Sequence, residues 1–319
     1  LRDVVARGAF HDSGERHSPP RCHKETRTGV LDRIINWLSG GNKGPPTQVL
    51  WMYARAGVGK SAIAQTFSEK LAAEKRLLAG FIFSRFDDMR NSGDRLIPTI
   101  AYQAALNIPG LREVIEAAVD RDPLVLGRSL DVQFTELIIQ PIQVLQKAGY
   151  FDNALAPRLI ILDGLDECKD EGLQADIVRL ISTTLDNHPT LPLKFLICSR
   201  KEQHLVIAFE SYFTKGLTRL NLQNMLLECY EDIRMFLVDK FAEIKRTHPL
   251  RSHIPADWPS PQTLHTLVKN SGGQFLYAST VIKYVENIRR RPPRQLELIL
   301  SKNPAPFTTI DQLYRDIFA

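Results

Sequence analysis

Residues 54–61 read Ala-Arg-Ala-Gly-Val-Gly-Lys-Ser and lie between an apolar run and a stretch of helical spacing. This order predicts a strand, a tight loop and a helix, which is how a phosphate-binding loop is built. Gly57 and Gly59 allow successive backbone N–H groups to converge on phosphate oxygens, and the helix points its positive end at them. We therefore predict that the chain binds a nucleoside triphosphate.

Two side chains of this loop have predicted roles. We expect the Lys60 ammonium to contact the β- and γ-phosphates and the Ser61 hydroxyl to coordinate Mg²⁺. Further nucleotide contacts are expected from Ala56, Gly57, Val58, Gly59 and Ala62. The motif has glycine where this chain has Ala54, and a Cβ there is expected to narrow the turn, restrict its backbone angles and weaken binding.

A second motif is a short apolar run that ends in carboxylates. Residues 159–162 are consecutive apolar residues, which predicts a strand buried on both faces of a parallel sheet with Asp163 at its carboxyl edge. There Asp163 is expected to hold Mg²⁺ through water. Asp166 and Glu167 follow within one turn and are candidates to orient or deprotonate a hydrolytic water, with Glu167 favoured. Alternatively, both carboxylates cap a helix that begins near Lys169.

A third apolar run, at residues 193–198, ends in Ser199 and Arg200. If its strand belongs to the same parallel sheet, its end reaches the same crevice. A guanidinium there binds triphosphate better than diphosphate, so Arg200 is a candidate sensor of the γ-phosphate and stabiliser of the transition state. The alternative is an arginine at the surface end of a strand.

Together these motifs resemble those of NACHT-type signal-transducing NTPases of the STAND class. The resemblance is greatest to the nephrocystin-like NACHT modules of large fungal receptor proteins, and Gly164 between the acidic positions is typical of NACHT proteins. The matching segments occur in family order over nearly the whole chain, at residues 57–64, 81–85, 97–103, 162–168, 195–200 and 271–280.

The resemblance also implies how the base is bound. It implies that the adenine pocket is lined by the backbone of Thr26, Arg27 and Thr28 and by the side chains of Val30 and Leu31. Helical spacing by itself favours Val30, Ile34 and Trp37 as an apolar face that packs in a core. The family's C-terminal helices form a lid over the nucleotide, with residues 271–275 near adenine, although the proline of relatives is missing here.

The alternation of strands and helices predicts an α/β fold. Strands are expected near residues 48–54, 78–86, 158–162, 193–199 and 217–222, and helices over 95–106, 132–145, 230–241, 263–269 and 274–285. We predict a P-loop NTPase with a mainly parallel, helix-flanked sheet, followed by a small all-helical subdomain. The expected parts are an N-terminal arm or linker (1–25), the NTPase core (26–223) and the helical subdomain (224–319), with a last helix at 310–318 and a winged-helix or repeat region beyond it.

Composition limits the class of protein. The chain has 319 residues, 44% of them hydrophobic and 24% charged, which suits a globular protein of one large or two smaller domains. No apolar stretch approaches about twenty residues and no secretory pattern is present, so we expect a cytoplasmic protein without a membrane span. The four cysteines lack C-x-x-C spacing, which predicts reduced thiols, and the adjacent Cys22 and His23 lack further metal ligands at suitable spacing.

The net charge is +5, and four arginines are concentrated at residues 288–294. Such a run could contact nucleic acid, but no aromatic residues are interleaved with it, so a solvated helix end and loop is favoured.

These inferences favour a switch driven by ATP or ADP with Mg²⁺. The resemblance implies slow ATP hydrolysis, self-association within a longer receptor and protein partners for flanking domains. The absence of an N-K-x-D guanine signature weighs against GTP. Two alternatives stay open, namely a catalytically inactive nucleotide-binding scaffold and an ATPase that depends on nucleic acid.

Overall fold

The computed structural model describes residues 1–41 and 46–302, and the helix predicted at 310–318 lies outside them. The chain divides into two compact units. The first comprises residues 1–21, 31–54 and 60–220, and the second comprises 22–30, 55–59 and 221 onward. The chain therefore enters and leaves the second unit within the predicted phosphate loop.

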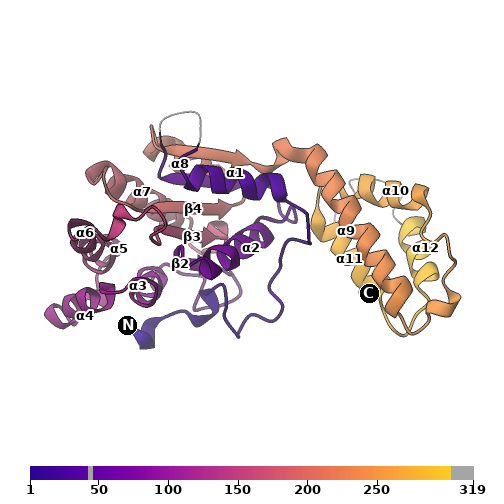
Figure 1. Cartoon of the computed structure of the whole chain (residues 1–319), viewed down its shortest axis with the longest axis horizontal. Helices are drawn as coiled ribbons and strands as arrows, with labels where there is room; N and C mark the ends of the chain where they lie inside the picture. Colours follow the sequence, from indigo (N-terminus) through magenta and orange to yellow (C-terminus); the bar gives the residue numbers. More distant parts are fainter. Residues whose placement is uncertain (42–45, 303–319) are drawn as a thin grey trace. The chain divides into compact units, whose positions relative to one another are not determined.

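The first unit is built on a five-stranded sheet (Figure 1). Its order is β2-β3-β4-β1-β5, and the pairings β2–β3, β3–β4 and β4–β1 are parallel. The strands are β1 (Val49–Tyr53), β2 (Leu77–Ile82), β3 (Leu159–Asp163), β4 (Lys194–Ser199) and β5 (Leu217–Asn221). All five lie where the sequence predicts them, except that β2 ends four residues early.

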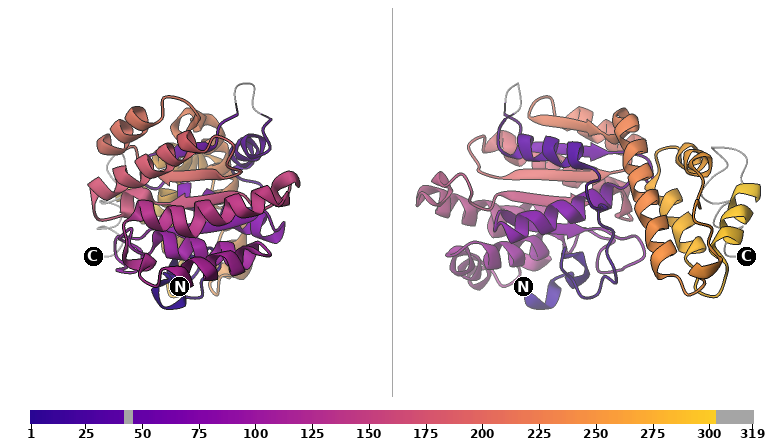
Figure 2. Two further views of the ribbon diagram at one scale, coloured as in Figure 1. Left: turned by 90° about the vertical axis from the view of Figure 1, so that its left-hand side faces the viewer. Right: turned by 45° about the vertical axis from the view of Figure 1, so that its right-hand side comes forward.

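Helices flank this sheet (Figure 2), which confirms the predicted α/β P-loop NTPase architecture. They are α1 (Thr28–Leu38), α2 (Lys60–Ala73), α3 (Leu96–Asn107), α4 (Leu111–Arg121), α5 (Leu130–Phe134), α6 (Gln140–Lys147), α7 (Glu171–Asn187) and α8 (Gln203–Tyr212). The helix predicted over 132–145 is present with a π-helical turn, Thr135–Ile139, between α5 and α6. Val30, Ile34 and Trp37 of α1 are all buried, so they form the apolar face that their spacing predicts.

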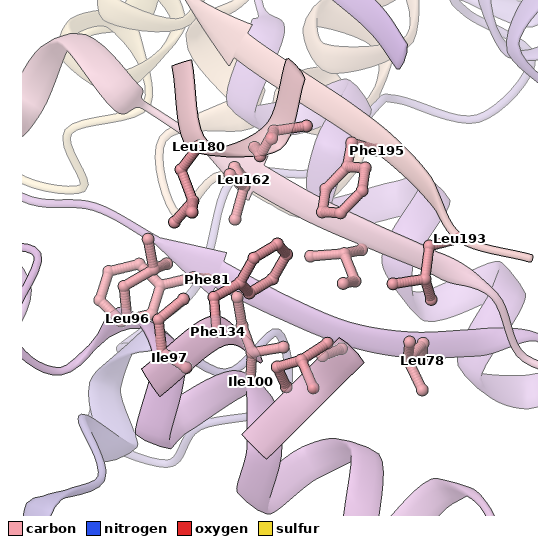
Figure 3. Packing of buried hydrophobic residues seen from close by; sticks show 14 of the residues in the cluster. Leu78, Phe81, Leu96, Ile97, Ile100, Phe134, Leu162, Leu180, Leu193 and Phe195 are labelled. Carbon is pink, nitrogen blue, oxygen red and sulfur yellow. The ribbon is translucent and has the colours of Figure 1, made fainter. Parts of the chain in front are cut away.

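The core of the first unit lies between the sheet and its helices (Figure 3). Phe81, Leu162 and Phe195 come from three neighbouring strands and are each almost fully buried. Burial of an aromatic or aliphatic side chain of this size contributes roughly 1.5–3 kcal/mol. The sheet that carries the site is therefore held on a rigid apolar base.

The N-terminal segment, expected as an arm or linker, packs on the first unit. Val5, Ala6 and Ala9 are buried, and the Ala6 amide donates to Thr99 Oγ1 at 3.0 Å. Arg21 closes the segment with a two-oxygen hydrogen bond to Glu69 of α2, at 2.9 Å to each oxygen. Residues 1–21 therefore form part of this unit's packed structure.

The second unit is helical beyond β5 and has its own core. It contains α9 (Leu226–Thr247), α10 (Pro261–Ser271), α11 (Phe275–Val285) and α12 (Pro292–Lys302), which confirms the helices predicted there. Ile233, Leu237, Phe241 and Val281 are buried at its centre. The arginines of 288–294 are exposed on the turn before α12 and on its first residues, as expected for a solvated helix end.

Two further expectations concern the whole described part of the chain. None of its helices has the length and apolar character that a membrane span needs. None of the four cysteines, all within the described residues, is in a disulfide bond, and three of them, Cys168, Cys198 and Cys229, are buried. The reduced state of these thiols stays a prediction.

Candidate phosphate-binding site

The three predicted site segments meet at one edge of the sheet. Tyr53 at the end of β1 pairs with Ser199 at the end of β4, and Asp163 at the end of β3 pairs with Cys198. The carboxyl ends of β1, β4 and β3 are therefore aligned. The start of the phosphate loop, Arg200 and Asp163 project from the same edge, where parallel sheets bind ligands.

The backbone of the loop depends on its glycines. Gly57 has φ +76° and Gly59 has φ +106°, a region that side-chain-bearing residues rarely adopt. Ala54 is fully buried, and it is not among the non-glycine residues with positive φ, which in the described part are Ser18, Glu25, Arg27 and Lys75. Position 54 therefore has no left-handed conformation that would need glycine, so backbone strain at Ala54 gives no reason for weaker binding.

Lys60 begins helix α2 and folds back along the loop. Its Nζ donates to the Ala54 carbonyl at 2.9 Å. Burial lowers the pKa of the Lys60 ammonium, and the negative charges of Asp166 and Asp163 act against this shift. The ammonium is thus held in a desolvated position between the loop and the two carboxylates, where a phosphate would meet little competition from water.

Asp163 and Ser61 form the second part of the site. The Ser61 hydroxyl hydrogen-bonds the Asp163 carboxyl group, which is 3% exposed. Burial raises the pKa of Asp163 to about 6, while the Ser61 hydrogen bond and the charge of Lys60 lower it. Asp163 Oδ1 is buried without a hydrogen-bond partner. A buried carboxylate oxygen that lacks a donor, beside a serine hydroxyl, fits a hydrated Mg²⁺, because oxygen ligands and retained waters suit this ion.

The described residues contain no group of three or more His, Cys, Asp or Glu side chains that could hold a metal. A Mg²⁺ ion would therefore take Ser61 and Asp163 from the protein and its other ligands from water and phosphate oxygens, as in phosphate-loop proteins generally.

Both carboxylate oxygens of Asp166 interact with Arg200. Its Oδ1 accepts from the Arg200 amide at 2.9 Å, and its Oδ2 lies 3.2 Å from Arg200 Nε. Ser199 Oγ, which accepts from Trp51 Nε1 at 2.9 Å, donates to the Arg200 carbonyl at 2.8 Å. Asp166 therefore fixes both the backbone and the side chain of Arg200 at the edge of the sheet.

Glu167 occupies the end of a short turn, Leu165–Glu167, that follows Gly164. Gly164 has φ +74°, a conformation that residues with side chains rarely adopt, so the turn favours glycine. Glu167 Oε2 accepts only a long hydrogen bond, at 3.4 Å from the Arg85 amide. Its carboxylate is thus held less firmly than that of Asp166.

The alternative role for these carboxylates, capping the next helix, is wrong. Helix α7 is capped by Asp170, whose Oδ1 accepts from the amides of Gly172 and Leu173 at 2.8 and 3.2 Å. Asp166 and Glu167 lie before this cap and remain candidates for the site.

Of the residues expected near adenine, Thr26, Arg27, Thr28 and Val30 belong to the second unit and Leu31 belongs to the first. Thr26 and Arg27 are buried, and Thr28, the first residue of α1, is exposed. The Thr26 hydroxyl donates to the His23 carbonyl at 2.7 Å. Arg27 has φ +60° and directs its guanidinium to the carbonyl of Val58, inside the phosphate loop.

Arg16 is a residue that sequence reasoning missed. Its Nη1 donates to Gln65 Oε1 of α2 at 2.8 Å, and Asp163 is the largest of the charges that act on it. Burial lowers the pKa of the Arg16 guanidinium, and the carboxylate of Asp163 opposes this shift. The N-terminal segment has no periodicity or motif, so only its packing on α2 reveals this second cation near the predicted Mg²⁺ ligand.

Comparison with known proteins finds one family and a number of distantly similar solved structures, including the two given below. The model of the family described as Nephrocystin 3, N-terminal, matches residues 30–200, more than half of the chain. The Walker-type ATPase PABY2304 of Pyrococcus abyssi is 13% identical over 95% of this chain and 91% of its own, with a TM-score of 0.45. PCH-2 of C. elegans is 9% identical over 91% of this chain and 66% of its own, with a TM-score of 0.35. No curated protein matches the chain.

Proposed function

Because this chain belongs to the family described as Nephrocystin 3, N-terminal, we propose that it is an ATP-binding NACHT module of the STAND class. In this proposal residues 26–223 form the NTPase core and residues 224–319 the helical subdomain. The module hydrolyses ATP slowly and acts as a nucleotide-dependent oligomerisation switch in a longer cytoplasmic signalling receptor. The nephrocystin-like segments of the sequence support the assignment.

One observation carries the proposal more than any other. Asp163 is buried with an unpartnered Oδ1, hydrogen-bonded by Ser61, and under the charge of Lys60. A buried carboxylate oxygen without a hydrogen-bond partner lowers stability, and proteins retain such groups where a ligand binds to them. Mg²⁺ with a nucleoside triphosphate is the ligand that fits this set of side chains.

The protein groups have separate tasks in this proposal. Lys60 and the loop amides bind the phosphates, and Ser61 and Asp163 hold Mg²⁺, which neutralises phosphate charge when bound. Glu167 orients the hydrolytic water, because its carboxylate has one weak protein contact whereas both oxygens of Asp166 are used by Arg200. Asp166 is thereby reassigned from a candidate base to the group that positions Arg200.

The switch needs a contact that differs between triphosphate and diphosphate states. Arg200 is the best candidate, because its side chain is 41% exposed and its guanidinium is held by a single carboxylate. A γ-phosphate would compete with Asp166 for this guanidinium, and loss of that phosphate would return it to Asp166. The catalytically inactive scaffold is the second candidate, favoured by the commitment of Asp166 to Arg200.

The decisive experiment identifies the nucleotide that the purified chain carries. The chain is denatured, and released nucleotide is identified by chromatography and mass, with Lys60→Ala as the control. ADP from the wild-type chain and none from the variant would support the switch with adenine preference. A chain that carries no nucleotide and fails to bind added Mg²⁺-ATP would contradict the proposal.

A further inference from the structure

The tip of the phosphate loop is held from outside by two hydrogen bonds to its carbonyl groups. The Leu276 amide donates to the Gly57 carbonyl at 3.1 Å, and Arg27 Nη2 donates to the Val58 carbonyl at 2.5 Å. All four residues belong to the second unit, whereas Ala54 and Lys60 on either side of the tip belong to the first. The loop's amides face a phosphate in such motifs, so its carbonyls are free to take these donors.

The Leu276 contact replaces a missing helix cap. Helix α11 begins at Phe275, and its N-cap residue Gln274 makes no side-chain capping hydrogen bond. The first amides of a helix need acceptors from outside the helix. The Gly57 carbonyl supplies one, so the hydrogen bond pairs an unpaired amide of the first turn of α11 with a carbonyl of the phosphate loop.

The Arg27 contact is reinforced from α9 and α11. Arg27 Nη2 lies 3.1 Å from Cys229 Sγ, and its Cζ lies 4.8 Å from the centre of the Phe275 ring. The Arg27 amide donates to Asp232 Oδ2 at 3.1 Å. The side chain is therefore fixed by two helices of the second unit while it holds Val58.

Stability alone does not account for this arginine. It is 3% exposed, and its φ of +60° is unusual for a residue with a side chain. Its Nε and Nη1 are buried without hydrogen-bond partners, and the ion pair of Nε with Asp232 Oδ2 is long, at 3.9 Å. Buried charged donors that lack acceptors are costly. Strain of this kind is concentrated where a residue serves a site.

We propose that Arg27 and the first turn of α11 form a latch on the phosphate loop, through which helices α9 and α11 set how firmly the loop holds a nucleotide. Arg27 is a positioning residue, because it acts through the Val58 carbonyl rather than on the phosphates. The proposal rests on nucleotide binding at this loop. It adds that contacts from α9 and α11 to the loop tip regulate the affinity of the loop for nucleotide.

The test replaces Arg27 with methionine in the full chain, with Arg234→Met on the exposed face of α9 as the matched control. Methionine keeps most of the volume against Phe275 but removes the donor to Val58. Three quantities are measured for each variant: the melting temperature, amide exchange of the peptide spanning 55–61 without nucleotide, and association and dissociation rates of Mg²⁺ with a fluorescent ADP.

We expect Arg27→Met to stay folded and to melt close to the wild-type chain, because the loss of two unsatisfied donors offsets the loss of the long ion pair with Asp232. Loop exchange and ADP dissociation should each be roughly tenfold faster, as for loss of one charged hydrogen bond, with association changed less than about twofold. The control should match the wild-type chain. A folded variant with unchanged loop exchange would overturn the latch.

The exchange measurement separates the two proposals. If the wild-type chain binds no nucleotide, the proposed function fails, and exchange in the nucleotide-free loop still decides whether Arg27 holds it. If Arg27→Met does not fold, Arg27→Lys is measured in the same way, because lysine keeps the charge but lacks the guanidinium's several donors. If neither variant folds, Arg27 is structural and the latch is rejected.

Discussion

Asp166 contacts both the backbone and the side chain of Arg200, with one carboxylate oxygen 2.9 Å from the amide nitrogen and the other 3.2 Å from Nε. Two residues that were separate candidates for catalysis are therefore one unit. The pair places a cation at the sheet edge, whereas Glu167 accepts a long hydrogen bond, at 3.4 Å from the Arg85 amide.

Asp166→Asn should lower the free energy of unfolding by about 1–3 kcal/mol, because the neutral amide cannot replace a buried carboxylate that accepts a hydrogen bond from Arg200 and forms an ion pair with it. Urea denaturation at pH 7 measures this. Asp176→Asn is the control, because Asp176 pairs with Arg179 at an exposed position and should contribute less than about 1 kcal/mol. Equal effects of the two substitutions would show that the Asp166 pair is not specially held.

The contribution of Asp163 to the stability of the nucleotide-free chain should decrease as pH rises from about 4 to about 6. The native pKa of Asp163 is about 6, above its ordinary value of 3.8, so the folded chain binds more protons in this window than the unfolded chain. The stabilisation is complete below pH 3.8 and lost once pH passes 6, by up to about 3 kcal/mol. Asp163→Asn should remove this contribution from the profile of stability against pH and should raise stability at pH 7. Parallel wild-type and variant profiles in urea unfolding would contradict the assignment.

Glu167→Gln should preserve nucleotide binding and slow hydrolysis. If Glu167 orients or deprotonates the water, the loss is on the order of 10²–10⁴-fold. Phosphate release at saturating Mg²⁺-ATP gives the rate, and equilibrium titration gives the affinity. Glu171→Gln, in the exposed first turn of α7, is the control. An unchanged rate in Glu167→Gln would remove Glu167 from its role.

Two substitutions in the phosphate loop should differ in their effect on nucleotide affinity. Gly59→Ala should abolish tight nucleotide binding and cost about 1–3 kcal/mol, because φ at Gly59 is +106°. Ala54→Gly restores the consensus residue but relieves no left-handed conformation, so it should leave affinity unchanged and cost about 0.5–1 kcal/mol in chain entropy. Titration with fluorescent ADP and thermal melting measure both. A large gain of affinity in Ala54→Gly would show that its Cβ does obstruct the loop.

Much of the fold was predictable because its signals are local. The apolar run at 159–162 can be satisfied only by burial on both faces, and the glycines of the loop mark turns that side chains resist. Helix α11 was predicted from its apolar spacing to within one residue. Aligned strand ends then follow from parallel pairing, so the meeting of Asp163 with the phosphate loop was predictable as well.

Other relationships were not predictable, because they join residues that no local pattern connects. The structure inserts β4 between β1 and β3, which puts Arg200 beside Asp166 and makes the second an anchor for the first. It assigns the cap of α7 to Asp170, a choice among neighbouring acidic residues that depends on backbone geometry.

By itself the sequence determined the strands, the helices, the left-handed glycine positions and the residue types offered to a phosphate and a metal, since each depends on neighbours along the chain. Only the tertiary structure decided which charges are neutralised by protein partners and which stay available. Asp166 is taken by Arg200, Asp163 keeps an unpartnered oxygen, and Arg27 reaches the Val58 carbonyl. The physical reason is that burial and pairing of charged groups depend on packing between distant segments, and these determine the pKa and the reactivity of each group.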